Sequence, residues 1–181
     1  MNTALPSVHL RAMEPEDLDL LYRIENDRLL WNVGTTNVPY SRYTLHDYIA
    51  NASGDIYTDC QVRLMIENEE GQTLGIADIV NFDPKHRRAE LGVVIECAYR
   101  RKGYAQAALL KLSEYALRHL HLHQLYVCIS VDNEPSLHLF RKMGYQHSAT
   151  LRDWLFDGCT YHDAVVMQLL LISSDAGTPN K

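Results

Sequence analysis

The stretch Arg100-Arg101-Lys102-Gly103-Tyr104-Ala105 separates an apolar segment, residues 89–96, from the strongest helical pattern in the chain. A glycine lets the backbone approach a ligand closely, and the free N–H groups that begin the following helix attract an anion. Basic side chains are unfavourable there unless an anion lies between them and the helix. The stretch therefore predicts a pyrophosphate-binding turn, with a solvated basic turn as the alternative. It is not a P-loop or a dinucleotide fingerprint, because no Gly-Lys-Ser/Thr follows and it has a single glycine.

Strand and helix patterns surround this turn. Alternation typical of strands occurs in residues 8–12, 62–66, 73–80, 89–96, 125–131, 146–156 and 161–171. Spacing typical of helices occurs in residues 14–22, 42–52, 105–118 and 133–143. Asp157-Gly158, between the last two strands, is typical of a tight turn. The order predicts an α/β (α+β) domain in which the basic turn leads from a strand into a helix.

Length and composition fit one soluble domain. The chain has 181 residues, of which 46% are hydrophobic, enough for one core. Its formal net charge of -6 argues against a mainly electrostatic nucleic-acid binder. The N-terminal residues lack a signal-peptide pattern and no segment has the length of a membrane span, so we expect a cytoplasmic protein with no membrane partner. We expect one domain over residues 1–172 and a disordered tail over 173–181.

Neither the cysteines nor the histidines form a metal-site pattern. The four cysteines are widely spaced and are interpreted as reduced thiols in the core: Cys60, Cys97, Cys128 and Cys159. His119, His121 and His123 alternate at the end of the long helix, but only His119 and His123 share a helical face. No third ligand is evident, so we expect no metal.

Motifs further along the chain complete a resemblance to a known family. Leu125-Tyr126-Val127 is the next strand, Asn133 follows, and then comes the segment Leu139-Phe140-Arg141-Lys142-Met143-Gly144-Tyr145. Together with the basic turn, they resemble the Gcn5-related N-acetyltransferase (GNAT) superfamily, with its Gln/Arg-x-x-Gly-x-Gly/Ala and Asn…Tyr-x-Lys-x-Gly-Phe signatures. His86-Arg87-Arg88-Ala89-Glu90 is similar to bacterial spermidine/diamine acetyltransferases. Asn133-Glu134-Pro135-Ser136 is similar to ribosomal-protein N-terminal acetyltransferases.

The resemblance implies both a fold and an activity. The implied GNAT fold is a mixed, mostly antiparallel sheet of about seven strands, splayed at the fourth and fifth and flanked by about four helices. The implied activity is transfer of acetyl from acetyl-CoA to the primary amine of a small molecule or peptide. A polyamine or diamine such as spermidine is the first acceptor to consider, and a protein N-terminus, another small amine or an antibiotic is the second. A non-catalytic acyl-CoA sensor is an alternative of a different class, and a homo-oligomer is left open.

The resemblance also implies a set of cofactor-binding residues. Val93, Val94 and Ile95 would line the pantetheine, although a plain core strand explains them equally well. The pyrophosphate would be held by Arg100, Arg101, Lys102, Gly103, Tyr104, Ala105 and Gln106, mostly through main-chain N–H groups. Asn133 would contact the cofactor or serve only as a helix cap. The implied cofactor site is completed by Ser136, Phe140 and Lys142.

Three residues are candidates for the chemistry. Acyl transfer needs an unprotonated amine, and a lysine-like amine with a pKa of ~10 must first lose a proton. The resemblance assigns that proton to Glu90, whose alternative role is a surface ion pair with Arg87 or Arg88. Phe140 stands where the family has a tyrosine general acid and has no proton to give. Ser136, four residues earlier on the same helix, would replace that tyrosine, or is an ordinary surface serine.

The acceptor is less well indicated. Related enzymes place acids in the loop after the first helix and on the third strand, where this chain has Asn32–Asn37 and Asn81. Carboxylates that would compensate are Glu25, Asp27, Asp47 and Asp78, and nothing in the sequence indicates that they converge.

Overall fold

The computed structural model describes residues 4–31, 38–52 and 54–171. The segment Asn32–Asn37 and the predicted tail, residues 173–181, therefore lie outside the described residues. The strands are β1 (Val8–Arg11), β2 (Val62–Asn68), β3 (Thr73–Asp83), β4 (Arg88–Ile95), β5 (Gln124–Ser130), β6 (Gln146–Phe156) and β7 (Tyr161–Leu170). The α-helices are α1 (Leu18–Glu25), α2 (Arg28–Trp31), α3 (Arg42–Ala50), α4 (Ile56–Asp59), α5 (Tyr104–Arg118) and α6 (Glu134–Lys142). Short 3-10 helices cover Pro15–Asp17 and Cys97–Tyr99.

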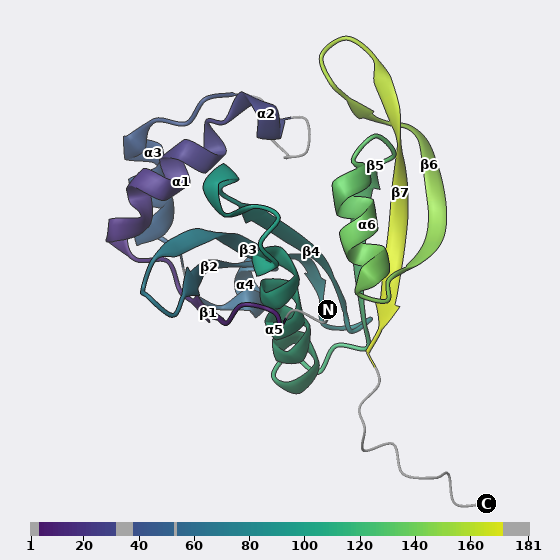
Figure 1. Cartoon of the computed structure of the whole chain (residues 1–181), viewed down its shortest axis with the longest axis horizontal. Helices are drawn as coiled ribbons and strands as arrows, with labels where there is room; N and C mark the ends of the chain where they lie inside the picture. Colours follow the sequence, from purple (N-terminus) through teal and green to yellow (C-terminus); the bar gives the residue numbers. More distant parts are fainter. Residues whose placement is uncertain (1–3, 32–37, 53, 172–181) are drawn as a thin grey trace, which may run out of the picture.

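The strands form one seven-stranded sheet in the order β1-β2-β3-β4-β5-β7-β6. Every neighbouring pair is antiparallel except β4 and β5, which run parallel. Those two strands pair only at Arg88 with Gln124, Ala89 with Leu125, and Glu90 with Tyr126, and then they part (Figure 1). The mixed sheet with splayed fourth and fifth strands is thus confirmed.

Helices cover both faces of the sheet. On one face, Leu20 and Ile24 of α1 pack against Met65 of β2 and Ile76 of β3. The main core includes Leu109 and the rest of the buried side of α5, which lies on the other side of β1–β4 from α1 and α3 (Figure 1). Burial of these apolar side chains is the main stabilising contribution, at about 25 cal/mol per Å².

The four predicted helices are α1, α3, α5 and α6. The one-turn helices α2 and α4 were not predicted, because four residues are too few to display a helical period. The interpretation of the cysteines as core residues is wrong for three of them: Cys60, Cys97 and Cys159 are exposed, and only Cys128 is partly buried. None of the helices in the described segments is long and apolar enough to cross a membrane.

Candidate active site

The basic turn exposes the N-terminus of α5. Arg101 and Gly103 both have left-handed backbone conformations, with φ of 61° and 89°. Gly103 is the N-cap of α5, and no side chain caps this end. The first helical bond runs from the Ala107 N–H to the Gly103 carbonyl, at 3.0 Å, so the preceding N–H groups have no helical acceptor. Such an uncapped helix start is suited to bind a phosphate.

The turn is connected to the parted end of β4. The Arg100 side chain turns back and donates from Nε to the Ile95 carbonyl, at 2.8 Å. Val93, Val94 and Ile95 follow the last β4–β5 pair, so main-chain groups on the β5 side of β4 have no strand partner there. Buried main-chain groups require hydrogen-bond partners, and an extended ligand that lies along β4 would supply them.

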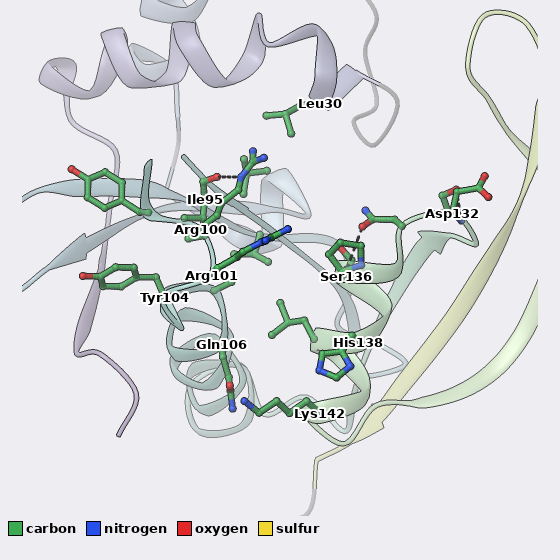
Figure 2. Close-up of a pocket in the computed structure, with 18 of the residues that line it drawn as sticks. Leu30, Ile95, Arg100, Arg101, Tyr104, Gln106, Asp132, Ser136, His138 and Lys142 are labelled. Carbon is green, nitrogen blue, oxygen red and sulfur yellow. Dashed lines mark hydrogen bonds between the residues drawn. The ribbon is translucent and has the colours of Figure 1, made fainter. Parts of the chain in front are cut away.

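A cleft of about 1010 Å³ runs from the turn to the start of α6 (Figure 2). It is lined by most of the predicted cofactor residues: Val93, Val94, Ile95, Arg100, Arg101, Gly103, Tyr104, Ala105, Gln106, Asn133, Ser136 and Lys142. Basic side chains, free main-chain groups of the parted strand and an uncapped helix start thus share one cavity. These features fit the pyrophosphate and the extended pantetheine of acetyl-CoA.

The helix α6 forms one wall of the cleft. Asn133 caps it through Oδ1, which accepts the Ser136 N–H at 3.2 Å, so the capping role is confirmed, and the same residue lines the cleft. Ser136 lies in the first turn of the helix and Lys142 ends it. At 1.5 Å per residue, Asn133 and Lys142 are about 14 Å apart along α6. In Figure 2, Asp132 accordingly lies well away from Gln106 and Lys142.

Two predicted cofactor residues do not line the cleft. The Lys102 ammonium lies over the Tyr99 ring, 5.4 Å from its centroid. Phe140 is 4% exposed and belongs to the core, where its ring meets that of Tyr145 edge-on at 5.0 Å. Burial also raises the pKa of the Tyr145 hydroxyl. At the place of the family's tyrosine, the structure therefore has an apolar ring that faces the core.

Glu90 lies where β4 and β5 begin to part. It is half-buried, opposite Tyr126, and its Oε2 accepts a hydrogen bond from Asn81 Nδ2 at 2.8 Å. The alternative ion pairs are not formed, because Arg87 donates to the His121 carbonyl and Arg88 pairs with Asp83. Burial, followed by the charge of Glu90, raises the pKa values of Tyr126 and Cys128.

Glu90 is not among the residues that line the cleft, although Val94 is. Glu90, Gly92 and Val94 alternate along β4 and so share a face of the sheet. Because Gly92 has no side chain, no β4 side chain lies between the Glu90 carboxylate and Val94 on this face of the strand.

The sequence patterns did not identify a cluster at the far end of the cleft. His162 of β7 lies between two carboxylates, with Nδ1 at 2.7 Å from Asp132 Oδ2 and Nε2 at 2.8 Å from Asp157 Oδ2. The hydrogen bonds to Asp157 and Asp132 raise the pKa of His162. The N–H of Thr160 and the His162 ring hold the pKa of Asp157 well below its usual range. Other lining residues that were missed are Leu30, Tyr99, Ser130, Pro135, His138, Leu139, Leu155 and Phe156.

The four carboxylates considered for the acceptor do not gather in the cleft. Glu25 and Asp78 both pair with Arg63, and Arg63 Nε donates to Asp78 Oδ1 at 2.8 Å. Burial lowers the pKa of Arg63, but Asp78 and Glu25 outweigh it and the pKa is raised. Asp47 accepts from the Asn51 side chain, at 2.8 Å. Glu25 and Asp78 therefore hold α1 against the sheet through Arg63 instead of binding a ligand in the cleft.

Comparisons with known proteins agree with this geometry. The profile of the acetyltransferase (GNAT) domain matches residues 7–146, and the chain belongs to this family. Spermidine N(1)-acetyltransferase of Escherichia coli (strain K12) is 28% identical over 167 residues, 90% of this chain and 87% of that protein. YdaF of Bacillus subtilis (strain 168), provisionally named a ribosomal N-acetyltransferase, is 29% identical over 90% of this chain and 91% of that protein.

Solved structures show the same fold. The crystal structure of spermidine N-acetyltransferase from Vibrio cholerae in complex with CoA and spermine superposes with a TM-score of 0.80, at 24% identity, over 90% of this chain and 95% of that chain. A dodecameric structure of the same Vibrio cholerae protein matches with a TM-score of 0.73, at 24% identity, over 90% and 93% of the two chains. Family membership makes this protein an acetyl-CoA-dependent N-acetyltransferase. Within the described segments, no three His, Cys, Asp or Glu side chains are arranged to hold a metal ion.

Proposed function

We propose that this protein acetylates a diamine or polyamine such as spermidine, in the cytoplasm. The observation that carries the proposal is the separation of charge in the cleft. Arg100, Arg101 and the α5 N-terminus suit the anionic part of acetyl-CoA. Asp132 and Asp157 lie at the other end, where they share His162 and keep one net negative charge when its ring is protonated. A polyamine keeps a second ammonium that needs a carboxylate while its first amine reacts. The similarity to the Escherichia coli spermidine enzyme supports the same acceptor class.

The cofactor end of the site acts by binding and orientation. Main-chain N–H groups of residues 103–106 hold the pyrophosphate, with Arg101 and Lys142 nearby, and the parted edge of β4 holds the pantetheine. Bound acetyl-CoA supplies the acetyl group as a thioester. A free β4 N–H beside the thioester would stabilise the negative charge that develops on its oxygen.

Two side chains are proposed for the proton and the sulfur. Glu90 takes the proton of the acceptor ammonium through water, and Asn81 holds its carboxylate in place. Ser136 lines the cleft and would contact the departing sulfur, since Phe140 lies in the core and has no hydroxyl. The thiolate of coenzyme A is a tolerable leaving group, so one weak donor is sufficient.

A second acceptor class is favoured by a different observation. YdaF is as similar in sequence as the spermidine enzyme, so a protein N-terminus is the second candidate. The non-catalytic acyl-CoA sensor considered from the sequence rested only on the absence of a tyrosine at position 140, and family membership argues against it. We also propose a homo-oligomer, because the related Vibrio cholerae protein is dodecameric in one solved structure.

One experiment separates these functions. The purified protein is incubated with acetyl-CoA and one amine at a time. The amines are spermidine, spermine, putrescine, N-terminal peptides of ribosomal proteins and an aminoglycoside. Release of free thiol gives kcat/KM, and mass spectrometry identifies the acetylated product. The proposal expects the highest kcat/KM with a polyamine. Efficient acetylation of peptides alone would replace it with the second candidate, and tight acetyl-CoA binding without thiol release would favour the sensor.

A further inference from the structure

The imidazole of His162 has both ring nitrogens against carboxylates. Nδ1 lies 2.7 Å from Asp132 Oδ2, and Nε2 lies 2.8 Å from Asp157 Oδ2. An ionised carboxylate only accepts hydrogen bonds, and a neutral imidazole has one N–H to donate. Both contacts are therefore hydrogen bonds only if both ring nitrogens carry a proton. The Thr160 hydroxyl, 3.1 Å from Nε2, is the remaining polar neighbour of the ring.

The clamp formed by Asp132, His162 and Asp157 joins two parts of the cleft wall. Asp132 directly precedes Asn133, the cap of α6, and Asp157 follows β6 in the turn to β7. The Asp157 side chain also organises that turn, because its Oδ1 accepts the N–H groups of Cys159 and Thr160 at 2.7 and 2.8 Å. His162 thus connects the β6–β7 turn to the start of the helix that carries Ser136.

The outer part of this hairpin extends beyond the last β5–β7 pair, Ser130 with Ala164. β6 is the edge strand of the sheet and pairs with β7 alone. Their register shifts between Leu151 and Leu155, and Asp153 in between has a left-handed φ of 48°. Beyond this irregularity, Leu155 and Phe156 line the cleft. Both residues still pair with β7, Leu155 with His162 and Phe156 with Tyr161. β7 in turn meets the chain before α6 through the Ser130–Ala164 pair and the bond from the Val131 N–H to the Asp163 carbonyl, at 3.0 Å. The clamp adds a charged side-chain connection just beyond these main-chain bonds, between the β6–β7 turn and Asp132.

We propose that His162, as an imidazolium, is a positioning residue that holds the β6–β7 turn against the start of α6 and so sets the acceptor end of the cleft. Its effect on the acceptor rests on the proposed function. Its protonation state does not, and can be measured without any acceptor.

The charges around His162 give the direction of the pH dependence. Asp132 faces it from the loop before α6 and Asp157 from the β6–β7 turn, and both raise its pKa. Asp163, the next residue of β7, turns its carboxylate to the Asp153 N–H instead, at 2.9 Å. Because the folded-state pKa is raised, the clamp is complete at low pH and is lost as pH rises through that value. The amine must lose its proton to react, so at alkaline pH the loss of the clamp opposes the gain in rate.

Nitrogen NMR of the histidine rings tests the protonation state directly. The His162 signals are assigned by their absence from the His162→Gln protein. We expect a titration midpoint above the ordinary value of about 6.5, with both ring nitrogens protonated at pH values below that midpoint. Asp132→Asn removes one of the two carboxylates and should lower the midpoint. A midpoint at or below about 6.5, or a midpoint unchanged by Asp132→Asn, would overturn the proposal whatever the acceptor is.

Kinetics test the positioning role. His162→Gln should raise KM for the amine roughly fivefold to tenfold, the scale of one lost charge-assisted hydrogen bond. KM for acetyl-CoA should change less than about twofold, because the clamp lies away from the basic turn. In the wild type, KM for the amine should increase as the pH is raised above the titration midpoint of His162. In the His162→Gln variant this increase should disappear.

A second histidine on the same hairpin provides the control. His147 on β6 is exposed and contacts Thr150 outside the cleft, so His147→Gln should behave as wild type. Equal kinetics for wild type and His162→Gln, or equal rises in both KM values, would show that His162 does not set the acceptor end. If the wild type acetylates no amine, the proposed function fails, and the NMR result still decides the charge of the clamp.

Discussion

Replacement of Gly103 by alanine tests the assignment of the phosphate turn, and Gly71→Ala is its matched control. Both glycines have left-handed φ angles, 89° and 76°. A Cβ at Gly71 would meet no atom within 4 Å, whereas a Cβ at Gly103 would lie 3.0 Å from Pro6 Cδ and 3.3 Å from Leu5 Cδ2. The left-handed conformation costs either alanine about 1–2 kcal/mol, and the contact adds about 1–3 kcal/mol at Gly103. We therefore expect unfolding free energies lower by about 1–2 kcal/mol for Gly71→Ala and about 2–5 kcal/mol for Gly103→Ala.

Thermal unfolding with and without acetyl-CoA measures the consequence for binding. At a ligand concentration of about 100 Kd, binding stabilises the native state by about 2.7 kcal/mol. In a chain of this size, that corresponds to a rise in Tm of about 5–11 °C. Gly71→Ala should keep the full rise, and Gly103→Ala should lose most of it, because the Cβ displaces the uncapped start of α5. A folded Gly103→Ala protein with the wild-type rise would refute the assignment.

The other predictions concern the reacting groups. Glu90→Gln should lower kcat, measured by thiol release, by about a hundredfold or more. The affinity for acetyl-CoA, measured by calorimetry, should be nearly unchanged. A variant with wild-type kcat would show that another residue is the base. Ser136→Ala should lower kcat more than it raises either KM, because it removes a contact made mainly in the transition state, and equal kcat values would make Ser136 an ordinary helix residue. Phe140→Tyr buries a hydroxyl in the core and should destabilise by about 1–3 kcal/mol without a faster rate. An accelerated Phe140→Tyr enzyme would mean that this ring reaches the sulfur.

The fold could be predicted because its signals are local. Alternating apolar residues identify every strand, and the basic turn with its glycine identifies the connection from β4 to α5. Parting of β4 and β5 was expected only from the family resemblance, since both strands have the ordinary apolar alternation. The side-chain environment of Phe140 could not be predicted either. Whether that ring faces the core or the cleft depends on how α6 is rotated against the sheet.

The acceptor end of the cleft could not be predicted, because its residues meet only in three dimensions. Asp132 and His162 are 30 positions apart, and both aspartates had adequate local interpretations, as part of a helix cap and of a tight turn. Similarly, Glu25 and Asp78 were considered for the acceptor, and the structure pairs both with Arg63 and places them outside the cleft. Pairing of distant charges is visible only when the strands have been placed.

The parting of β4 and β5 divides the sheet into two parts that share one hydrophobic core. β1–β4 with α1, α3 and α5 form one, and β5–β7 with α6 form the other, and the strand ladder joins them at only three residue pairs. Amides of β4 that point into the gap should exchange with solvent deuterium far faster than their neighbours bonded to β3. A ligand that binds both edges acts as a missing strand and slows this exchange. The supply of acetyl-CoA would then govern the resistance of the enzyme to proteolysis, and so the lifetime of the folded chain as well as its rate of turnover.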